Sequence, residues 1–283
     1  MSKDVLNVGD ISVTSLTDGR LVFDQRITFP ETPLEHWEQY YDIFPEYFSK
    51  PYFLLNLGVF LMRSAGKTLV ADTGFGPHGQ MLGSDTPADL LNDFERKRIR
   101  TDEIDTIFLT HLHGDHVGWN TRPEELSKPT FENARYRVHR ADWEHFTSPE
   151  ILADELRGEA VKRSVIPLDD AGVLDLIEGE EELAPGITAI HTPGHTPGHM
   201  SLIISSGRER ALLIGDVLGS PMHVTDPDLT YWPDTDKEQG KATRHDLLDM
   251  AEDENMVVLG SHLSPPGWGL LVRWQGRRYW KGM

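Results

Sequence analysis

Three histidines and one aspartate lie within six consecutive positions of this chain, as His111, His113, Asp115 and His116. Imidazole and carboxylate groups are the ligands that hold zinc and related divalent ions in proteins. The spacing allows His111 and His113 to converge on one ion while Asp115 and His116 turn toward a second. Two ions in one pocket generate hydroxide from water at neutral pH and polarise the bond under attack. A His-rich surface loop is the alternative, and it is disfavoured because the chain supplies further ligands elsewhere.

The composition narrows the choice of ligands and partners. The 283 residues include no cysteine, so a metal must be held by His, Asp and Glu side chains alone. The formal net charge of −19 disfavours nucleic acid as a partner, because an acidic surface repels the phosphate backbone. The segment from Met1 to Val8 has no apolar run, so we expect neither a signal peptide nor a membrane helix. We therefore expect a soluble, cytoplasmic protein that makes no membrane contact.

Apolar periodicity and turn residues place strands and helices along the chain. Alternating apolar residues on both sides of Asp18-Gly19 predict two strands joined by a hairpin turn there. Further strands are predicted at 52–62, 68–71, 107–109, 136–139, 187–190, 200–204, 211–214, 256–259 and 269–274, and helices at 88–98, 141–146, 149–157 and 236–251. The polar and aromatic region 31–47 is expected to cover a pocket mouth or another part of the protein. The alternation of predicted strands and helices along the chain suits two mixed sheets with helices outside, a layered α/β architecture.

Candidate ligands follow the ends of several predicted strands. His111 comes after the strand at 107–109, Asp216 after 211–214 and His262 after 256–259. Loops that follow the strands of a rigid scaffold are where catalytic residues are commonly carried. A further segment, Thr192 to His199, contains Pro-Gly-His twice. Spacing alone leaves His191, His195 and His199 equally suitable as ligands.

The order of these segments resembles the metallo-β-lactamase-fold hydrolase superfamily. The likeness runs from about Val13 to Trp280, and Asp72-Thr73-Gly74 also matches an early motif of that superfamily. The resemblance implies one domain over residues 1–283, built as a four-layer αββα sandwich of two mixed β-sheets flanked by helices. It also implies a binuclear metal site, whose ligands would be His111, His113 and His195 for one ion, Asp115, His116 and His262 for the other, and Asp216 as the bridge. His195 is chosen because the family's ligand lies in the first Pro-Gly-His.

Within the superfamily, the chain resembles the lactonase and organophosphate hydrolase branch. The segments that carry this likeness are Asp216, Thr243-Arg244, Leu247-Leu248, Ser261-His262, Pro266 to Leu270 and Tyr279-Trp280. Quorum-signal lactonases often carry a tyrosine soon after the bridging aspartate, whereas Val217 to Ser220 contains none. Trp119 stands where relatives commonly have glycine.

This branch implies a function and a set of cofactors. Metal-bound hydroxide would attack a lactone, including an acyl-homoserine lactone, or a related ester, and Asp115 would shuttle a proton to the leaving alkoxide. The cofactors would be two divalent ions, zinc first, with cobalt, manganese or iron able to replace it. The partners would be a small-molecule substrate and, as in many relatives, a second copy in a homodimer. Phosphotriester hydrolysis and a mononuclear iron, persulfide dioxygenase-like oxidation are the alternatives. Thioester hydrolysis, β-lactam hydrolysis and a purely binding role are weaker ones.

Other residues near the motifs are candidates for supporting roles. Asp72 could fix the tautomer of a ligating imidazole, as second carboxylates near metal sites do. Phe75, Trp119 and Trp232 are candidates for an apolar pocket, and His223 for a place facing the cleft. Trp119 in particular is expected to narrow the room for a phosphotriester. The remaining histidines are expected to pack, cap helices or lie at the surface; they are His36, His78, His139, His145, His191, His199 and His245.

Overall fold

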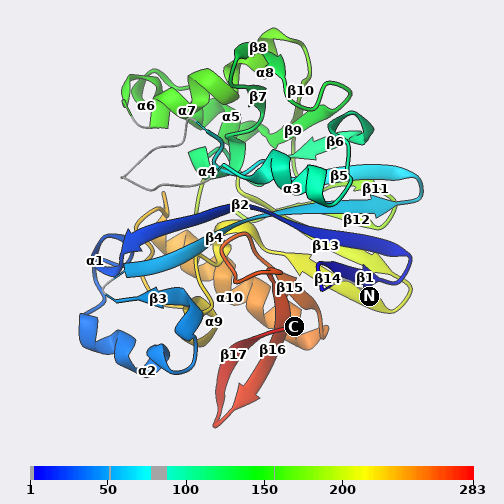
Figure 1. Cartoon of the computed structure of the whole chain (residues 1–283). Helices are drawn as coiled ribbons and strands as arrows, with labels where there is room; N and C mark the ends of the chain where they lie inside the picture. Colours follow the sequence, from blue (N-terminus) through cyan, green and yellow to red (C-terminus); the bar gives the residue numbers. More distant parts are fainter. Residues whose placement is uncertain (1–2, 51, 78–87, 156) are drawn as a thin grey trace.

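A computed structural model describes residues 3–50, 52–77, 88–155 and 157–283. Two large β-sheets lie face to face, with helices α3 to α8 on the outer side of one and helix α10 on the outer side of the other (Figure 1). Both sheets are mixed, because each combines antiparallel pairs with parallel ones. The layered α/β fold predicted from the sequence is therefore confirmed.

The first sheet has the strand order β1-β2-β4-β5-β6-β9-β10, with β3 paired to β4. Its strands are β1 Val5–Val8, β2 Ile11–Asp24, β3 Phe48–Ser49, β4 Tyr52–Ser64, β5 Lys67–Ala71, β6 Thr106–Phe108, β9 Arg135–His139 and β10 Leu174–Ile177. The pairs β5–β6, β6–β9 and β9–β10 are parallel, so these strands end at one edge of the sheet.

The second sheet has the order β11-β12-β13-β14-β15-β16-β17. Its strands are β11 Glu181–Ala184, β12 Ile187–His191, β13 Met200–Ser206, β14 Glu209–Leu213, β15 Val257–Leu259, β16 Trp268–Trp274 and β17 Arg277–Gly282. Strands β14 and β15 are parallel, and the chain between them includes helix α10. A small separate ribbon pairs β7 Thr121–Arg122 with β8 Glu125–Pro129.

The four predicted helical segments correspond to α3, α5, α6 and α10, and the other α-helices of the described residues were not predicted. The α-helices are α1 Gln25–Thr28, α2 Glu38–Tyr41, α3 Leu90–Arg96, α4 Gly114–Val117, α5 Arg140–Phe146, α6 Pro149–Ala153, α7 Arg157–Ser164, α8 Ile166–Asp170, α9 Met222–Thr225 and α10 Lys237–Asp253. The segment predicted as one helix at 149–157 ends as α6 at Ala153, and α7 begins only at Arg157. Within the described residues, no helix combines the length and the apolar character needed to span a bilayer.

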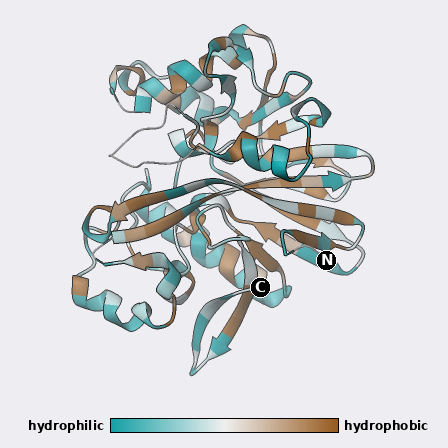
Figure 2. Ribbon diagram, in the orientation of Figure 1, coloured by the Kyte–Doolittle hydropathy of each residue, from teal (hydrophilic) through white to brown (hydrophobic). Residues whose placement is uncertain are grey.

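Three layers of buried apolar side chains hold the sandwich together, and Figure 2 shows hydrophobic residues gathered along the strands. The layer between the sheets includes Val13, Phe60, Met62, Phe108, Leu202 and Leu213. The layer between the first sheet and its helices includes Leu61, Val70, Phe94, Ile107, Phe131 and Val161. The layer between the second sheet and α10 includes Leu212, Ile214, Leu247, Leu248 and Val258. Alternate residues of one strand thus face different layers, as the pleat of a strand requires.

Region 31–47 forms a short helical cover beside the sheets. It contains the 3₁₀ turns η1 Leu34–Trp37 and η2 Pro45–Tyr47 on either side of α2. The aromatic rings of this cover pack against β4 and against the residues Phe75 and Tyr231. The prediction that this region covers another part of the protein is confirmed.

The hairpin predicted at Asp18-Gly19 is wrong. Strand β2 runs through both residues, and its register with β4 shifts between Thr17 and Arg20, which is a β-bulge. Gly19 takes a φ of 117°, a value that favours glycine. Bulges and hairpin turns both use glycine to redirect the chain, so the dipeptide alone cannot separate them.

The bulge turns the buried Asp18 side chain toward three other segments. Its Oδ2 accepts hydrogen bonds of 2.8 Å from the backbone N–H groups of Phe75 and Gly76. Its Oδ1 accepts from the N–H of Leu90 at 2.8 Å and from Nε1 of Trp119 at 2.9 Å. One carboxylate therefore satisfies donors from the loop after β5, the start of α3 and the segment after α4.

We expect Asp18→Ala to lower the free energy of unfolding by about 3 kcal/mol or more, because each buried donor left without an acceptor costs roughly 1–3 kcal/mol. Urea denaturation measures the change. Asp246→Ala, at an exposed position of α10, is the control and should change stability by less than about 0.5 kcal/mol. Equal effects of the two substitutions would contradict the role given to Asp18.

Candidate metal centre

The four segments that carry candidate ligands meet at one end of the sandwich. His111 and His113 lie in the loop after β6, and the adjoining helix α4 carries Asp115 and His116. His195 lies in the connection between β12 and β13. Asp216 lies in η5, Gly215–Val217, directly after β14, and His262 follows β15. Strand ends of both sheets therefore bring these seven side chains together.

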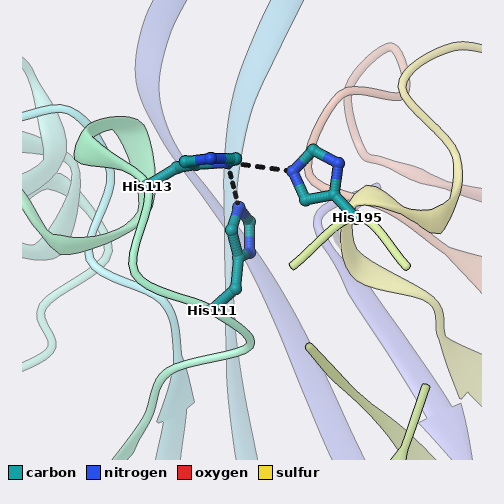
Figure 3. A group of neighbouring side chains, drawn as sticks. All are labelled: His111, His113 and His195. Carbon is teal, nitrogen blue, oxygen red and sulfur yellow. Dashed lines mark hydrogen bonds between the residues drawn. The ribbon is translucent and has the colours of Figure 1, made fainter. Parts of the chain in front are cut away.

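The first donor group consists of three imidazoles. Nδ1 of His113 lies 3.0 Å from Nε2 of His111 and 2.9 Å from Nε2 of His195. Figure 3 shows the three rings converging on one point, two from one segment and the third from another. Three nitrogens that each lie 2.0–2.1 Å from a tetrahedral zinc ion are about 3.3 Å apart, close to the spacing here.

The second donor group combines Asp115, His116 and His262. Oδ2 of Asp115 lies 3.7 Å from Nε2 of His116 and 3.5 Å from Nε2 of His262. The two histidines are buried, whereas the Asp115 side chain is 19% exposed. In each of these groups all candidate ligand atoms lie within 4.8 Å of one another.

Asp216 lies between the two groups. Its Oδ2 is 3.4 Å from Nε2 of His195 and 3.2 Å from Nε2 of His262. Its Oδ1 is 3.4 Å from Nε2 of His116. A carboxylate in this position reaches both donor groups at once, as a bridging ligand must.

Four of the five imidazoles are held through the nitrogen that points away from the cluster. Nδ1 of His111 contacts Thr110 Oγ1 at 3.0 Å, and Nδ1 of His262 donates to the backbone oxygen of Asn56 at 2.8 Å. Nδ1 of His116 donates to Asp72 Oδ2 at 2.8 Å, and Nδ1 of His195 donates to Asp234 Oδ1 at 2.9 Å. These contacts place the proton on Nδ1 and turn the Nε2 lone pair of each ring inward, which suits a metal ligand.

The electrostatics of the cluster favour a bound cation. Burial lowers the pKa of His111 and His113 well below the usual value, so both rings are neutral. Burial alone also lowers the pKa of His116, but Asp216, Asp115 and Asp72 together raise it well above its usual value. Burial raises the pKa of Asp216, yet His262 and His116 hold that pKa well below its ordinary range. The carboxylate half of the site therefore draws positive charge into the interior.

The donor set fits divalent metal ions. The inward nitrogens of His111, His113 and His195 lie 2.9–3.0 Å from one another through His113 Nδ1, close enough for one divalent ion to take a lone pair from each. Among the described residues, His116 Nε2 and Asp216 Oδ1 are buried and have no hydrogen-bond partner. Buried polar atoms without partners are costly, and a metal ion bound to them would remove that cost.

A cavity of about 620 Å³ opens onto the donor groups. His113, Asp115, Asp216 and His262 line its base. The wall contains apolar and aromatic side chains, among them Leu21, Phe23, Leu55, Phe75, Tyr231 and Trp232. Of the predicted pocket residues, the structure brings Phe75 and Trp232 to this wall.

Trp119 and His223 are not in that wall. Trp119 belongs to the core between the first sheet and its helices, and its indole N–H donates to Asp18. The steric role expected for Trp119 in the cleft therefore finds no support. His223 is fully buried, with its ring beside Phe29 and Tyr231 and its Nδ1 accepting from the N–H of Gly219. Both rings are close in sequence to a candidate ligand, but neither lines the cavity.

The remaining histidines have structural partners. Nε2 of the buried His199 accepts from the backbone N–H of Asp216 at 3.1 Å. His191 donates to the oxygen of Pro197 and stacks on His139, which caps α5. His36 and His245 pair with Asp226 and Asp228. His145 was expected only to cap or lie at the surface, but it lines the cavity. His78 lies outside the described residues.

Three residues at the site were not found from the sequence. Asp142 is buried and accepts from the N–H groups of Leu112 and Gly198, which ties the first histidine loop to the His195 loop. Burial raises the pKa of Asp142 to about 6. Tyr231 stacks on His195 with ring centroids 5.7 Å apart, and Asp234 contacts the same imidazole. All these contacts are distant in sequence, so no local pattern points to them.

Comparison with known proteins assigns the family. The family model of the Metallo-beta-lactamase superfamily matches residues 59–262, which is more than half of the chain. The chain therefore belongs to the metallo-β-lactamase superfamily.

Several curated relatives are N-acyl homoserine lactonases. One from a Bacillus species is 32% identical over 137 residues, which cover 48% of this chain and 47% of the relative. Another, from Bacillus cereus, is 28% identical over 178 residues, which cover 57% of this chain and 64% of the relative. The match thus spans between about half and two thirds of the length of these relatives.

Solved structures share the fold over nearly the whole chain. AidC, described as a dizinc quorum-quenching lactonase in complex with a product, has a TM-score of 0.85 and 21% identity, covering 99% of this chain and 96% of its own. The hydrolase AbOPH of the beta lactamase superfamily has a TM-score of 0.85 and 22% identity, covering 98% and 95%. At these identities the likeness shows the fold alone.

We expect the protein reconstituted with zinc to hold about two ions per chain, because two donor groups share Asp216. Elemental analysis after removal of free metal measures the number. One ion per chain, or none, would contradict the binuclear arrangement.

We expect His262→Ala and Asp216→Ala each to remove most hydrolytic activity while the chain still folds, because both residues lie on loops after strands. His245→Ala is the matched control, since that ring pairs with Asp228 at the surface. Steady-state rates and circular dichroism measure activity and folding. Rates within about tenfold of the parent, roughly 1.4 kcal/mol of barrier, would remove either residue from the site.

Proposed function

We propose that this protein is a metal-dependent hydrolase that opens a lactone, with an N-acyl homoserine lactone as the leading candidate, or cleaves a related ester. The observation that carries the proposal is the pair of donor groups joined by Asp216 at the base of a partly apolar cavity. The lactonase relatives point to the same chemistry. Zinc is the first choice for the two ions, with cobalt, manganese or iron able to take its place.

The side chains of the site divide the work of such a hydrolysis. Two divalent ions in these donor groups would supply hydroxide from water near neutral pH and polarise the carbonyl under attack. His111, His113 and His195 would hold one ion, and Asp115, His116 and His262 the other. Asp216 would hold the two at a fixed separation, because its oxygens reach both groups. This set needs no serine or cysteine nucleophile.

Asp115 is the candidate to move a proton. It is the one carboxylate of the second donor group that keeps contact with the cavity, with a side chain 19% exposed. A carboxylate there can take a proton from the attacking water and deliver it to the leaving alkoxide oxygen of the opened lactone. General acid catalysis of this kind requires hydrogen-bond reach to the leaving group, and Asp115 lines the cavity in which the substrate would lie.

The cavity wall favours a substrate with an apolar portion. Phe75 is buried and Trp232 is half exposed, so together they extend an apolar surface from the base of the cavity toward solvent. An acyl chain that lies along them would exclude water from the reacting carbonyl. Tyr231 completes the wall next to His195.

We expect the zinc-loaded protein to hydrolyse lactones with a higher kcat/KM than phosphotriesters. A lactone carbonyl is compact and planar, and its oxyanion settles with little rearrangement, whereas a phosphotriester needs room for two spectator groups and an in-line exit. The test is a panel of an acyl-homoserine lactone, a simple lactone, a phosphotriester and a thioester.

His262→Ala and the chelator-treated parent serve as controls for that panel. A preference for the phosphotriester would reverse the ranking and make phosphotriesterase activity primary. A chain that holds a single iron and oxidises a persulfide, with no lactone hydrolysis, would favour the dioxygenase-like alternative.

A further inference from the structure

We propose that Asp234 and Arg244 form a positioning pair that sets the metal affinity of the first donor group by acting through His195. The inference rests on the proposed function, because it takes His195 as a ligand. Oδ1 of Asp234 lies 2.9 Å from Nδ1 of His195, and both side chains are nearly fully buried. Neither Asp234 nor Arg244 belongs to the candidate ligands.

The contact determines which nitrogen of His195 faces the cluster. An ionised carboxylate only accepts hydrogen bonds, so Nδ1 of His195 must carry the proton. The lone pair is then on Nε2, which lies 2.9 Å from Nδ1 of His113. A carboxylate on the far nitrogen also makes the imidazole a stronger donor to a metal ion. Tyr231, stacked on the ring, limits its rotation.

Arg244 holds that carboxylate in place. Its side chain is 0% exposed, and its Nη2 lies 3.2 Å from Oδ2 of Asp234. A hydrogen bond between a guanidinium and a carboxylate is charge-assisted and fixes the geometry of both groups. The same guanidinium donates through Nε to the oxygen of Val217 at 2.8 Å and through Nη1 to the oxygen of Pro227 at 2.6 Å. Because Val217 follows Asp216, the pair also touches the loop that carries the bridging carboxylate.

The backbone around the pair leaves Asp234 little freedom. The N–H of Thr235 donates to the oxygen of His195 at 2.9 Å, and the N–H of Asp236 donates to the oxygen of Gly194 at 2.9 Å. A Cβ atom at Gly240 would lie 2.8 Å from Oδ2 of Asp234, so only glycine leaves room for the carboxylate there. The start of α10 is thus fitted against both Asp234 and the His195 loop.

A purely structural role makes a different prediction. Loss of one partner from a buried ion pair destabilises a protein, whereas loss of both charges together costs far less. If the pair served stability alone, a folded variant without either charge would bind metal as the parent does. If Asp234 acts on His195, the metal affinity stays low however stable the variant is.

The experiment compares Asp234→Asn, the double variant Asp234→Asn/Arg244→Gln and the parent. Asp228→Asn is the matched control, because it removes one acidic charge from a nearby exposed position. Zinc affinity is measured by competition with a chromophoric chelator, folding by thermal unfolding, and ligand geometry by the visible spectrum of the cobalt-substituted protein.

We expect both Asp234 variants to bind one of the two zinc ions about 10–100-fold more weakly than the parent, the range measured when a carboxylate partner of a ligating histidine is removed. The cobalt spectrum should change for that ion, and Asp228→Asn should match the parent. The double variant should be more stable than Asp234→Asn alone, because it leaves no unpaired buried guanidinium, but it should not recover zinc affinity.

Parent-like zinc affinity in the folded double variant would overturn the proposal and leave the pair a structural role only. Failure of the proposed function would look different, because the parent itself would then bind fewer than two zinc ions or hydrolyse no lactone. An unchanged zinc affinity in the Asp234 variants decides against the positioning role, whether or not the protein hydrolyses a lactone.

Discussion

Apolar packing between the two facing sheets is the constraint on which the metal centre depends. Strands β6, β14 and β15 contribute Phe108, Leu213 and Leu259 to that single inter-sheet layer. His111, Asp216 and His262 follow these strands within three residues. Because close-packed interiors deform little, the strand ends are fixed in space, and side chains from opposite sheets can meet within the short distances that metal ligands require. The fold itself therefore supplies the precision of the site.

That precision concentrates charge where solvent cannot screen it. Asp72 and Asp216 are both nearly fully buried, and the imidazoles of His111, His116, His195 and His262 are almost fully excluded from solvent. Each of these groups loses hydration on folding, which hydrogen bonds alone repay only when every polar atom finds a partner. The far nitrogens of the four imidazoles do find partners. Of the atoms that face inward, His116 Nε2 and Asp216 Oδ1 have no hydrogen-bond partner among the described residues, and a divalent cation bound to them would supply one.

The sequence predicts those parts of the molecule that depend on local patterns. Strands β4, β5, β6, β9 and β12 to β16 and helices α3, α5, α6 and α10 follow from apolar periodicity, and the ligand motifs follow from the residue types that metals require. The sequence around Asp18-Gly19 predicts a hairpin instead of the observed bulge, because the partners of the Asp18 carboxylate lie 57 to 101 residues away along the chain. Asp234 is 39 residues from its partner His195, and Asp142 is 56 residues from its partner Gly198. Local sequence patterns cannot reveal contacts over such separations. Trp119 shows that closeness in sequence does not ensure closeness in space, because it lies three positions after the ligand His116 and yet packs into the core.

The partners of the imidazoles also divide evenly between the two donor groups. In the first group, His111 contacts a neutral hydroxyl and His195 a carboxylate; in the second, His262 contacts a backbone oxygen and His116 a carboxylate. Thr110 Oγ1 lies 2.9 Å from Asp72 Oδ2 as well as 3.0 Å from His111 Nδ1, so one hydroxyl connects the partner of one group to the partner of the other. Hydrogen bonds in such a chain polarise one another. The two donor groups are therefore connected by two chains of contacts, through Asp216 inside the cluster and through Thr110 and Asp72 outside it.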